Sequence, residues 1–163
     1  MCEVLASGDS LIFKAPEIEA AFAYLSVRDL AERVEWEGGS LHIAPAHSEV
    51  EMLLRSICSA DVTSLLLDLK ESLLHMGWLV AGRGGVVRLR RSWRLRSGGF
   101  VTVEYDSHAR QVTVSTTDGC IVSALEKLGF AALRRGRIAD ASRRVSSLVE
   151  VLELGDSILR ACQ

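Results

Sequence analysis

The sequence feature best suited to chemistry is a set of arginines at alternate positions, Arg88, Arg90, Arg94 and Arg96. Alternate residues of a β-strand share one face, where neighbours lie roughly 6.8 Å apart. Guanidinium groups at this spacing repel one another unless an anion or a carboxylate lies opposite, and each offers a planar pair of donors that suits phosphate. The pattern predicts a sheet face that binds nucleic acid or another polyanion. RNA is slightly favoured, because a sheet face can carry single strands.

The neighbouring residues both support and weaken this interpretation. Thr102 and Thr113 are expected on the arginine face, where their hydroxyl groups add donors. Trp93 and Tyr105 alternate onto the opposite face, away from any base they could stack on. Arg91 falls on that otherwise apolar face, which indicates a bulge or a sheet edge. The alternative is a charged strand that prevents sheet-to-sheet aggregation or pairs with the acidic first half of the chain.

A second basic cluster combines a predicted loop with the start of a predicted helix. The loop holds Arg134, Arg135 and Arg137, and the helix start holds Arg143 and Arg144. Cations interact unfavourably with the dipole at a helix N-terminus, so this placement favours an external anion or an acidic partner. A solvated loop is the alternative.

Other residues that could do chemistry lack the partners they would need. His42 and His47 flank Pro45 and could approach one metal ion, but no third ligand is near them in the sequence. Cys120 follows Asp118 at a predicted helix start, where a thiolate is stabilised, yet no histidine is spaced to support it. Phosphate-loop, dinucleotide, serine-hydrolase and zinc-protease motifs are absent. We therefore expect no catalytic residue, metal or cofactor, and keep an enzyme with an unrecognised site as the third interpretation.

The cysteines and the overall amino-acid usage bear on the environment in which the protein works. The cysteines Cys2, Cys58, Cys120 and Cys162 form no CxxC pair and are interpreted either as buried thiols or as disulfides, of which Cys2–Cys162 would join the two ends. Arginine outnumbers lysine 16 to 3, asparagine is absent and glutamine occurs twice. This usage is typical of thermophile proteins and equally of a GC-rich genome.

Hydrophobic periodicity predicts an α+β protein in which an antiparallel β-meander packs against amphipathic helices. In the first half we expect a strand pair over 4–13, a helix from Pro16 that restarts near Ser26 and reaches Val34, a hairpin over 35–43, and helices over 48–57 and 61–76. In the second half we expect a meander over 87–116, extended by 78–80, a helix over 118–128, and a last helix from about Ala139 that Gly155 ends or kinks.

Charge is unevenly distributed along the chain. Residues 1–80 carry 13 acidic and 5 basic side chains, and residues 81–163 carry 8 and 14, so net charges of −8 and +6 make up the total of −2. One continuous domain over 1–163 is favoured, with a subdivision near 81–85 as the alternative. The start of the chain resembles no signal peptide and no apolar run could span a membrane, so we expect a cytoplasmic protein. The same charges allow a homo-oligomer or an assembly with a protein partner, in which acidic and basic halves pair.

Overall fold

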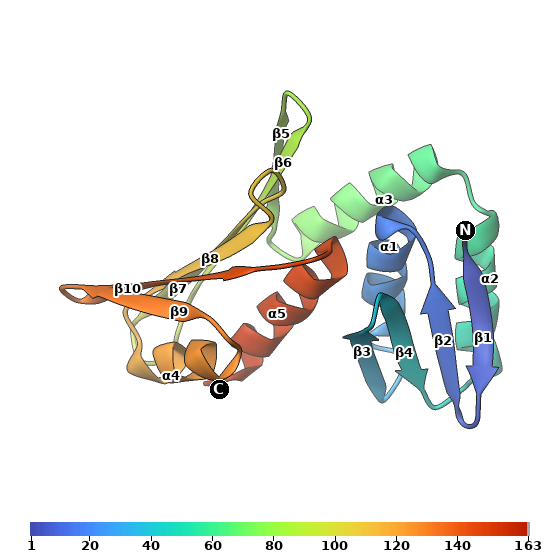
Figure 1. Ribbon diagram of the computed structural model, residues 1–163, viewed down its shortest axis with the longest axis horizontal. Helices are drawn as coiled ribbons and strands as arrows, with labels where there is room; N and C mark the ends of the chain where they lie inside the picture. The colour runs from blue at the N-terminus through green and yellow to red at the C-terminus, as the bar shows by residue number, and fades with distance from the viewer. Residues whose placement is uncertain (163) are drawn as a thin grey trace. The chain divides into compact units, whose positions relative to one another are not determined.

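Residues 1–162 fold into five helices and ten strands that form two antiparallel sheets, which confirms the α+β class (Figure 1). The structure is a computed structural model and describes residues 1–162. It divides into two compact units, Met1–Ser72 and Leu73–Gln163, called here the first and the second unit. Helix α3 (Val62–His75) carries the chain from one unit to the other. The prediction of a single domain with a subdivision near 81–85 concerns cooperative folding and stays a prediction.

The first unit is a four-stranded sheet with the order β1-β2-β4-β3, and two of its helices, α1 and α2, pack against each other. Its elements are β1 (Glu3–Ser7), β2 (Ser10–Lys14), α1 (Glu17–Val27), β3 (Arg33–Glu37), β4 (Ser40–Ala44) and α2 (Ser48–Ser59). Leu11 and Phe13 of β2 pair with Ile43 and Leu41 of β4, and all four side chains are buried. Alternation of buried and part-exposed residues thus gives this sheet one apolar face.

The predicted extension of the first helix to Val34 is wrong, because α1 ends at Val27. The amides of Leu30 and Ala31 donate to the carbonyl of Val27 and close a turn there. Val34 and the alternate apolar residue Trp36 then lie on β3 and pair with β4. A period of two therefore replaces the helical period that the sequence suggested.

The second unit is a six-stranded sheet with the order β5-β6-β7-β8-β10-β9, and α4 and α5 lie on one side of it (Figure 1). Its elements are β5 (Leu79–Arg83), β6 (Val86–Arg94), β7 (Phe100–Asp106), β8 (Gln111–Thr116), α4 (Gly119–Lys127), β9 (Ala131–Arg135), β10 (Ile138–Arg144) and α5 (Leu148–Arg160). The buried side chains of its three central strands alternate along them: Leu89, Val101, Val103, Tyr105, Val112 and Val114. The predicted meander and its extension before residue 87 are confirmed.

The predicted helix start at Ala139 is wrong, because residues 138–144 form strand β10. Ala139 and Ala141 are buried while their neighbours are not, and β10 pairs with both β8 and β9. Helix α5 begins only at Leu148, where the hydroxyl of Ser147 caps it by accepting the amide of Glu150 at 3.2 Å. Alanine fits either element, so propensity alone misplaced the boundary.

Gly155 lies inside α5 and neither ends nor kinks it. A Cβ atom at this position would lie 2.8 Å from Cζ2 of Trp78, closer than a real contact allows. The glycine is therefore required by the close approach of the Trp78 ring to the helix backbone.

The two units repeat one topology. Elements β1-β2-α1-β3-β4-α2 and β7-β8-α4-β9-β10-α5 follow the same order, and the sheet orders β1-β2-β4-β3 and β7-β8-β10-β9 correspond. The second unit adds the hairpin β5-β6 to this ββαββα motif. Each copy is thus a two-layer arrangement that can bury its own apolar face.

Each unit also has its own disulfide, Cys2–Cys58 in the first and Cys120–Cys162 in the second. No cysteine is free, so the interpretation as buried thiols and the pairing of Cys2 with Cys162 are both wrong for this structure. The first bridge joins the start of the chain to α2, and the second joins the first turn of α4 to the turn that follows α5.

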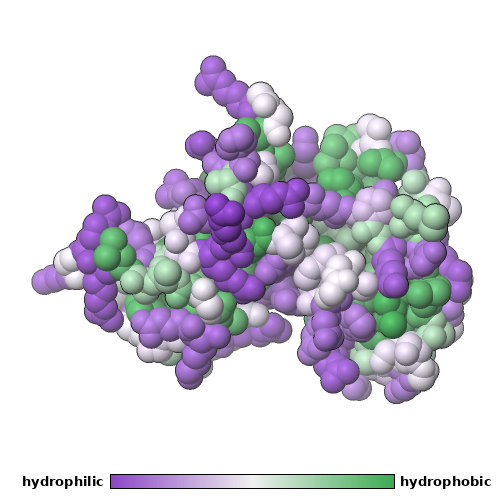
Figure 2. Space-filling view, in the orientation of Figure 1, coloured by the Kyte–Doolittle hydropathy of each residue, from purple (hydrophilic) through white to green (hydrophobic). Residues whose placement is uncertain are grey.

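The surface is mostly hydrophilic in the view of Figure 2, with hydrophobic residues in smaller patches. Exposed apolar side chains include Met52, Leu67, Leu79 and Leu133. Within residues 1–162, none of the helices combines the length and the apolar character that crossing a membrane requires.

Candidate polyanion-binding surface

The second unit's sheet has one face turned away from its buried side chains, called here the open face. Arg88, Arg90 and Arg94 point to this face from β6, since the buried Leu89 alternates with them. Strand pairing aligns Arg90 with Glu104 and Thr113, and Ser92 with Thr102. The expected sharing of one face is confirmed for Arg88, Arg90, Arg94, Thr102 and Thr113.

Two of these arginines face acids of the same chain. Arg88 Nε lies 3.6 Å from Oδ2 of Asp106, and Arg90 Nε lies 3.5 Å from Oε1 of Glu104. The backbone amide of Ala109 donates to the Asp106 carboxylate and, with the amide of His108 and the charge of Arg88, holds its pKa below the ordinary value of 3.8. Half of the predicted arginine set is therefore partly neutralised on the strand next to it.

Beside these pairs, hydroxyl groups and a carboxylate on neighbouring strands of the open face form hydrogen bonds. Ser92 and Thr102 share a hydrogen bond of 3.0 Å, and Ser115 donates to Oδ1 of Asp140 at 2.6 Å. Arg135 donates to the other oxygen of Asp140. The Ser115 hydroxyl and the Arg135 guanidinium together hold the pKa of Asp140 below 3.8.

The open face contains a shallow depression of about 610 Å³. Charged and polar side chains line it together with two small or aliphatic ones from β5; these residues include Leu79, Ala81, Arg88, Arg90, Glu104, Asp106, Gln111 and Thr113. Both ion pairs described above border this space. A ligand here would meet guanidinium groups that already have carboxylate partners.

Arg94 and Arg96 are placed differently. Strand β6 ends at Arg94, and Arg96 lies in the following turn, which closes by a hydrogen bond from the amide of Leu95 to the carbonyl of Gly99. The predicted position of Arg96 on the strand is therefore wrong. Both arginines are exposed, and among residues 1–162 neither takes part in an ion pair.

A second depression, of about 350 Å³, brings an aromatic ring next to these two arginines. It is lined by Trp93, Arg94, Leu95, Arg96, Leu159 and Cys162. The guanidinium carbon of Arg91 lies 5.8 Å from the centre of the Trp93 ring. The indole N–H of Trp93 is buried and has no acceptor in the described part of the chain.

The sheet edge expected from Arg91 is present, and the bulge is not. Pairing between β6 and β7 runs without interruption from Arg88 to Arg94, whereas β5 pairs with β6 only as far as Arg90. Residues 91–94 thus have a paired strand on one side only, and Trp93 is half-buried there.

The second basic cluster does not lie on a loop and a helix start. Arg134 and Arg135 are on strand β9, and Arg137 is in the turn to β10 with Gly136, whose φ is +64°. Arg134 and Arg137 are exposed and form no ion pair within the described residues. The two free cations therefore project from a hairpin.

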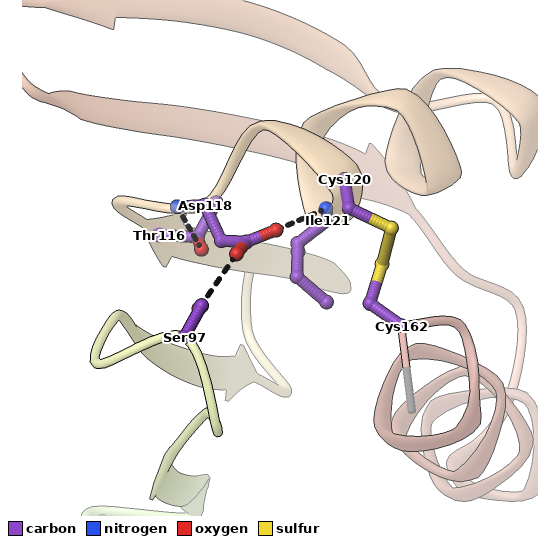
Figure 3. Close-up of a disulfide and its surroundings, with 6 residues drawn as sticks. All are labelled: Ser97, Thr116, Asp118, Cys120, Ile121 and Cys162. Atoms are coloured by element: carbon purple, nitrogen blue, oxygen red, sulfur yellow. Dashed lines mark hydrogen bonds between the residues drawn. A yellow bond between two sulfur atoms is a disulfide. The ribbon is translucent and has the colours of Figure 1, made fainter.

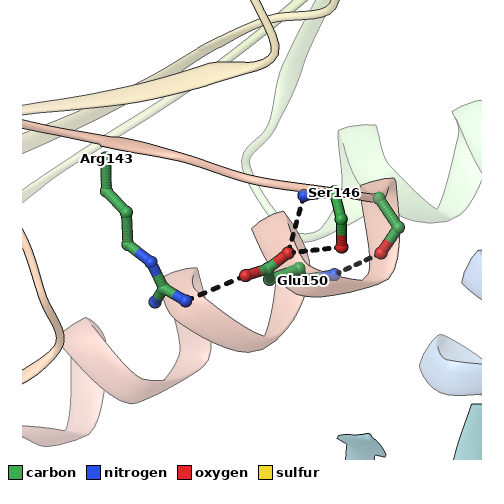
Figure 4. A network of polar contacts seen from close by, with 4 residues as sticks. Arg143, Ser146 and Glu150 are labelled. Carbon is green, nitrogen blue, oxygen red and sulfur yellow. Dashed lines mark hydrogen bonds and ion pairs between the residues drawn. The ribbon is translucent and has the colours of Figure 1, made fainter. Parts of the chain in front are cut away.

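Arg143 and Arg144 lie on β10, so the argument from an unfavourable helix dipole no longer applies to them. Arg143 Nη2 lies 2.9 Å from Oε1 of Glu150, whose Oε2 accepts the amide and hydroxyl of Ser146 (Figure 4). Glu150 stands three residues after Ser147 in the sequence, a capping-box spacing that was there to be recognised.

The candidate histidines and the candidate cysteine are placed as follows in the described residues. His42 lies on β4 and His47 precedes α2, and the described residues offer them no third metal ligand. Cys120 is bonded to Cys162, so its sulfur is not a free nucleophile. Asp118, beside it, caps α4 by accepting the amide of Ile121 at 3.1 Å (Figure 3).

The sequence also contains a pattern that predicts the acidic partners of these arginines. Glu104 and Asp106 alternate along a predicted strand next to the arginine strand, as cross-strand ion-pair partners do. No protein-family model, curated protein or solved structure matches this chain. The chemistry of the surface itself is therefore the basis for assigning it a function.

Proposed function

We propose that the protein is a non-catalytic binding protein that holds single-stranded RNA on the second unit. The observation that carries this proposal is the depression in which Trp93 lies beside two arginines, Arg94 and Arg96, that have no ion-pair partner among the described residues. Guanidinium groups suit phosphate, and an indole ring suits an unstacked base. We name RNA and not DNA because proteins that recognise RNA usually bind its single-stranded segments.

The other arginines add positive charge elsewhere on the second unit. Arg134 and Arg137 on the β9–β10 hairpin and Arg144 on β10 are also exposed and unpaired among residues 1–162. Arg88 and Arg90 form exposed ion pairs that water screens, so a phosphate can compete with the carboxylate for each guanidinium. The second unit as a whole carries 14 basic and 8 acidic side chains, a net +6.

Binding is tested by titrating fluorescently labelled single-stranded RNA, double-stranded RNA and single-stranded DNA with the full chain at low and moderate salt. We expect single strands to bind best and affinity to fall with salt by a slope of about 0.7 per phosphate contacted. Equal affinity for inorganic polyphosphate would indicate a general polyanion site. Absence of binding to all of these at low salt would refute the proposal.

The double substitution Arg94→Gln/Arg96→Gln should weaken RNA binding and lower the salt slope by about 1.4, because each loses one phosphate contact. Arg88→Gln/Arg90→Gln should have a smaller effect, because Glu104 and Asp106 already offset those charges. Arg33→Gln/Arg55→Gln is the matched control, since it removes two exposed arginines from the first unit. An equal loss in all three variants would indicate non-specific attraction.

Self-association is the second candidate function, and the opposite charges of the two units favour it. The first unit has 13 acidic and 5 basic side chains, a net −8 against +6 for the second. A symmetric dimer could pair each acidic unit with a basic one of the other chain. Sedimentation velocity at low salt and high protein concentration distinguishes this arrangement from a monomer.

A further inference from the structure

The disulfide of the second unit lies beside a carboxylate in a way that the disulfide of the first unit does not. Cys120 is in the first turn of α4, Cys162 follows α5, and Asp118 is the N-cap of α4 (Figure 3). The two sulfur atoms and a carboxylate oxygen of Asp118 all lie within 4.8 Å of one another. Among residues 1–162 this is the one group of three side chains with metal-ligand atoms at such distances.

We propose that reduction of the Cys120–Cys162 disulfide creates a zinc site formed by Cys120, Cys162 and Asp118. A dithiol reductant supplies two electrons and two protons, so the S–S bond becomes two thiols while the reductant becomes a disulfide. A Zn²⁺ ion then displaces the two thiol protons and binds both thiolates and the carboxylate. Water completes the tetrahedral coordination that zinc prefers.

The geometry suits this exchange. The Cα atoms of the two cysteines are 6.1 Å apart. Tetrahedral ligands at Zn–S distances of about 2.3 Å place two sulfurs roughly 3.8 Å from each other, which side-chain rotation can reach. Cys162 lies beyond the last residue of α5, so rotation of its side chain leaves the helix intact.

The surroundings suit both the reduction and the binding. Cys120 is exposed, so a reductant can reach the bridge. The hydroxyl of Ser97 donates to Oδ2 of Asp118 at 3.0 Å, and the amide of Ile121 donates to Oδ1. These two donors orient the carboxylate, as outer partners of metal ligands commonly do, and each oxygen retains a lone pair for the metal.

The test uses full-length Cys2→Ser/Cys58→Ser protein, in which the second unit's cysteines are the only pair left. After reduction and anaerobic removal of the reductant, it is titrated with Co²⁺ and then with Zn²⁺. We expect thiolate-to-cobalt charge-transfer absorption that saturates at one ion per chain and disappears as Zn²⁺ displaces Co²⁺. The oxidised protein should show no such absorption.

Two variants in the same background assign the ligands. Cys120→Ser should abolish the charge-transfer band. Asp118→Asn keeps the helix cap, because asparagine is an equally good N-cap, but should lower zinc affinity at least about tenfold. The reciprocal protein, Cys120→Ser/Cys162→Ser with Cys2 and Cys58 reduced, is the matched control and should bind no Co²⁺ as a thiolate complex.

Circular dichroism of the reduced protein shows whether the fold persists. The proposal is overturned if the folded, reduced protein binds no Co²⁺, or if Asp118→Asn binds zinc as tightly as its parent. Unfolding on reduction that Zn²⁺ does not reverse would also overturn it, because the three ligands meet only in the folded unit.

Discussion

At position 155, contact with a neighbouring side chain, and not the preference of the helix itself, requires a glycine. Replacing glycine by alanine in a helix ordinarily stabilises it by up to about 1 kcal/mol. At Gly155 the added Cβ would meet the Trp78 ring at 2.8 Å, and Trp78 is buried. Packing against Trp78 therefore outweighs helix propensity at this position.

We predict that Gly155→Ala lowers the free energy of unfolding by about 1–3 kcal/mol, the usual cost of an overpacked core. Urea unfolding measured by circular dichroism gives this difference. Gly119→Ala, at the first position of α4, is the control, because a Cβ there has open space around it and should leave stability unchanged or slightly raised. A stabilised Gly155→Ala protein would contradict the close contact.

Asp140 links protonation to stability at the residue scale. Its pKa is lower in the folded protein than the ordinary 3.8, chiefly because the Ser115 hydroxyl donates to it. Its contribution to stability is therefore present above that value and is lost as the pH falls through the folded pKa, because the unfolded chain then binds more protons.

The expected outcome is that Asp140→Asn makes stability depend less steeply on pH between about pH 5 and pH 2. Urea midpoints of the variant and the parent at several pH values across this range measure the effect. Asp68→Asn, an exposed carboxylate of the first unit, serves as control. Parallel midpoint curves for Asp140→Asn and the parent would show that the contact with Ser115 does not persist in solution.

At the scale of elements, Glu150 joins β10 to the start of α5. One carboxylate oxygen binds Arg143 of the strand, and the other accepts the amide and hydroxyl of Ser146. The carboxylate is partly buried, with 16% of the side chain exposed, so water screens these contacts only in part. The network therefore fixes where the strand ends and the helix begins.

Glu150→Ala is expected to lower the free energy of unfolding by about 2–3 kcal/mol, because hydrogen bonds to a charged group contribute about 1.5–3 kcal/mol. Chemical denaturation followed by circular dichroism is the measurement. Glu126→Ala on the exposed side of α4 should change stability by no more than about 0.5 kcal/mol. Equal effects of the two substitutions would mean that the network adds nothing.

The elements that could be predicted from the sequence are those whose apolar period is unambiguous. Strands β7 and β8 alternate buried with more exposed residues, β6 does so around Leu89, and α2 and α3 repeat apolar residues at helical spacing. Hairpin β9–β10 was missed because Ala131, Ala132, Ala139 and Ala141 suit helix and strand alike. Short alanine-rich strands obtain their structure from pairing with neighbours, which a local pattern does not contain.

The sequence predicted which strand face carries the arginines of β6, but it did not predict the carboxylates that pair with them. The sequence placed Arg88, Arg90 and Arg94 on one strand face, and the structure agrees. Their ion pairs depend on the register of β6 against β7. The depression beside Trp93 also requires Leu159 of α5 and Cys162 after it. Both features depend on contacts between residues far apart in the sequence.

Over the whole molecule, charge, topology and covalent links divide the chain in the same way. The sign of the charge changes between the two units, from −8 to +6, and each unit contains one ββαββα motif and one disulfide. Each unit also has its own buried side chains, such as Phe13 in the first and Val114 in the second. These observations lead us to test whether the two units are stabilised separately, as the alternative to the single domain that the sequence favours.

The two disulfides allow this division to be tested. Their cysteines are separated by 56 and 42 residues, so loop closure predicts a stabilisation of about 4 kcal/mol from each. Trp36 is the fluorescent reporter in the first unit, and Trp78 and Trp93 are the reporters in the second.

We expect Cys2→Ser/Cys58→Ser to shift only the unfolding transition reported by Trp36, measured in a Trp78→Phe/Trp93→Phe background. Cys120→Ser/Cys162→Ser should shift only the other transition, measured with Trp36→Phe. If either pair shifts both transitions equally, the chain unfolds as one cooperative domain, because destabilising one independent unit leaves the other unchanged.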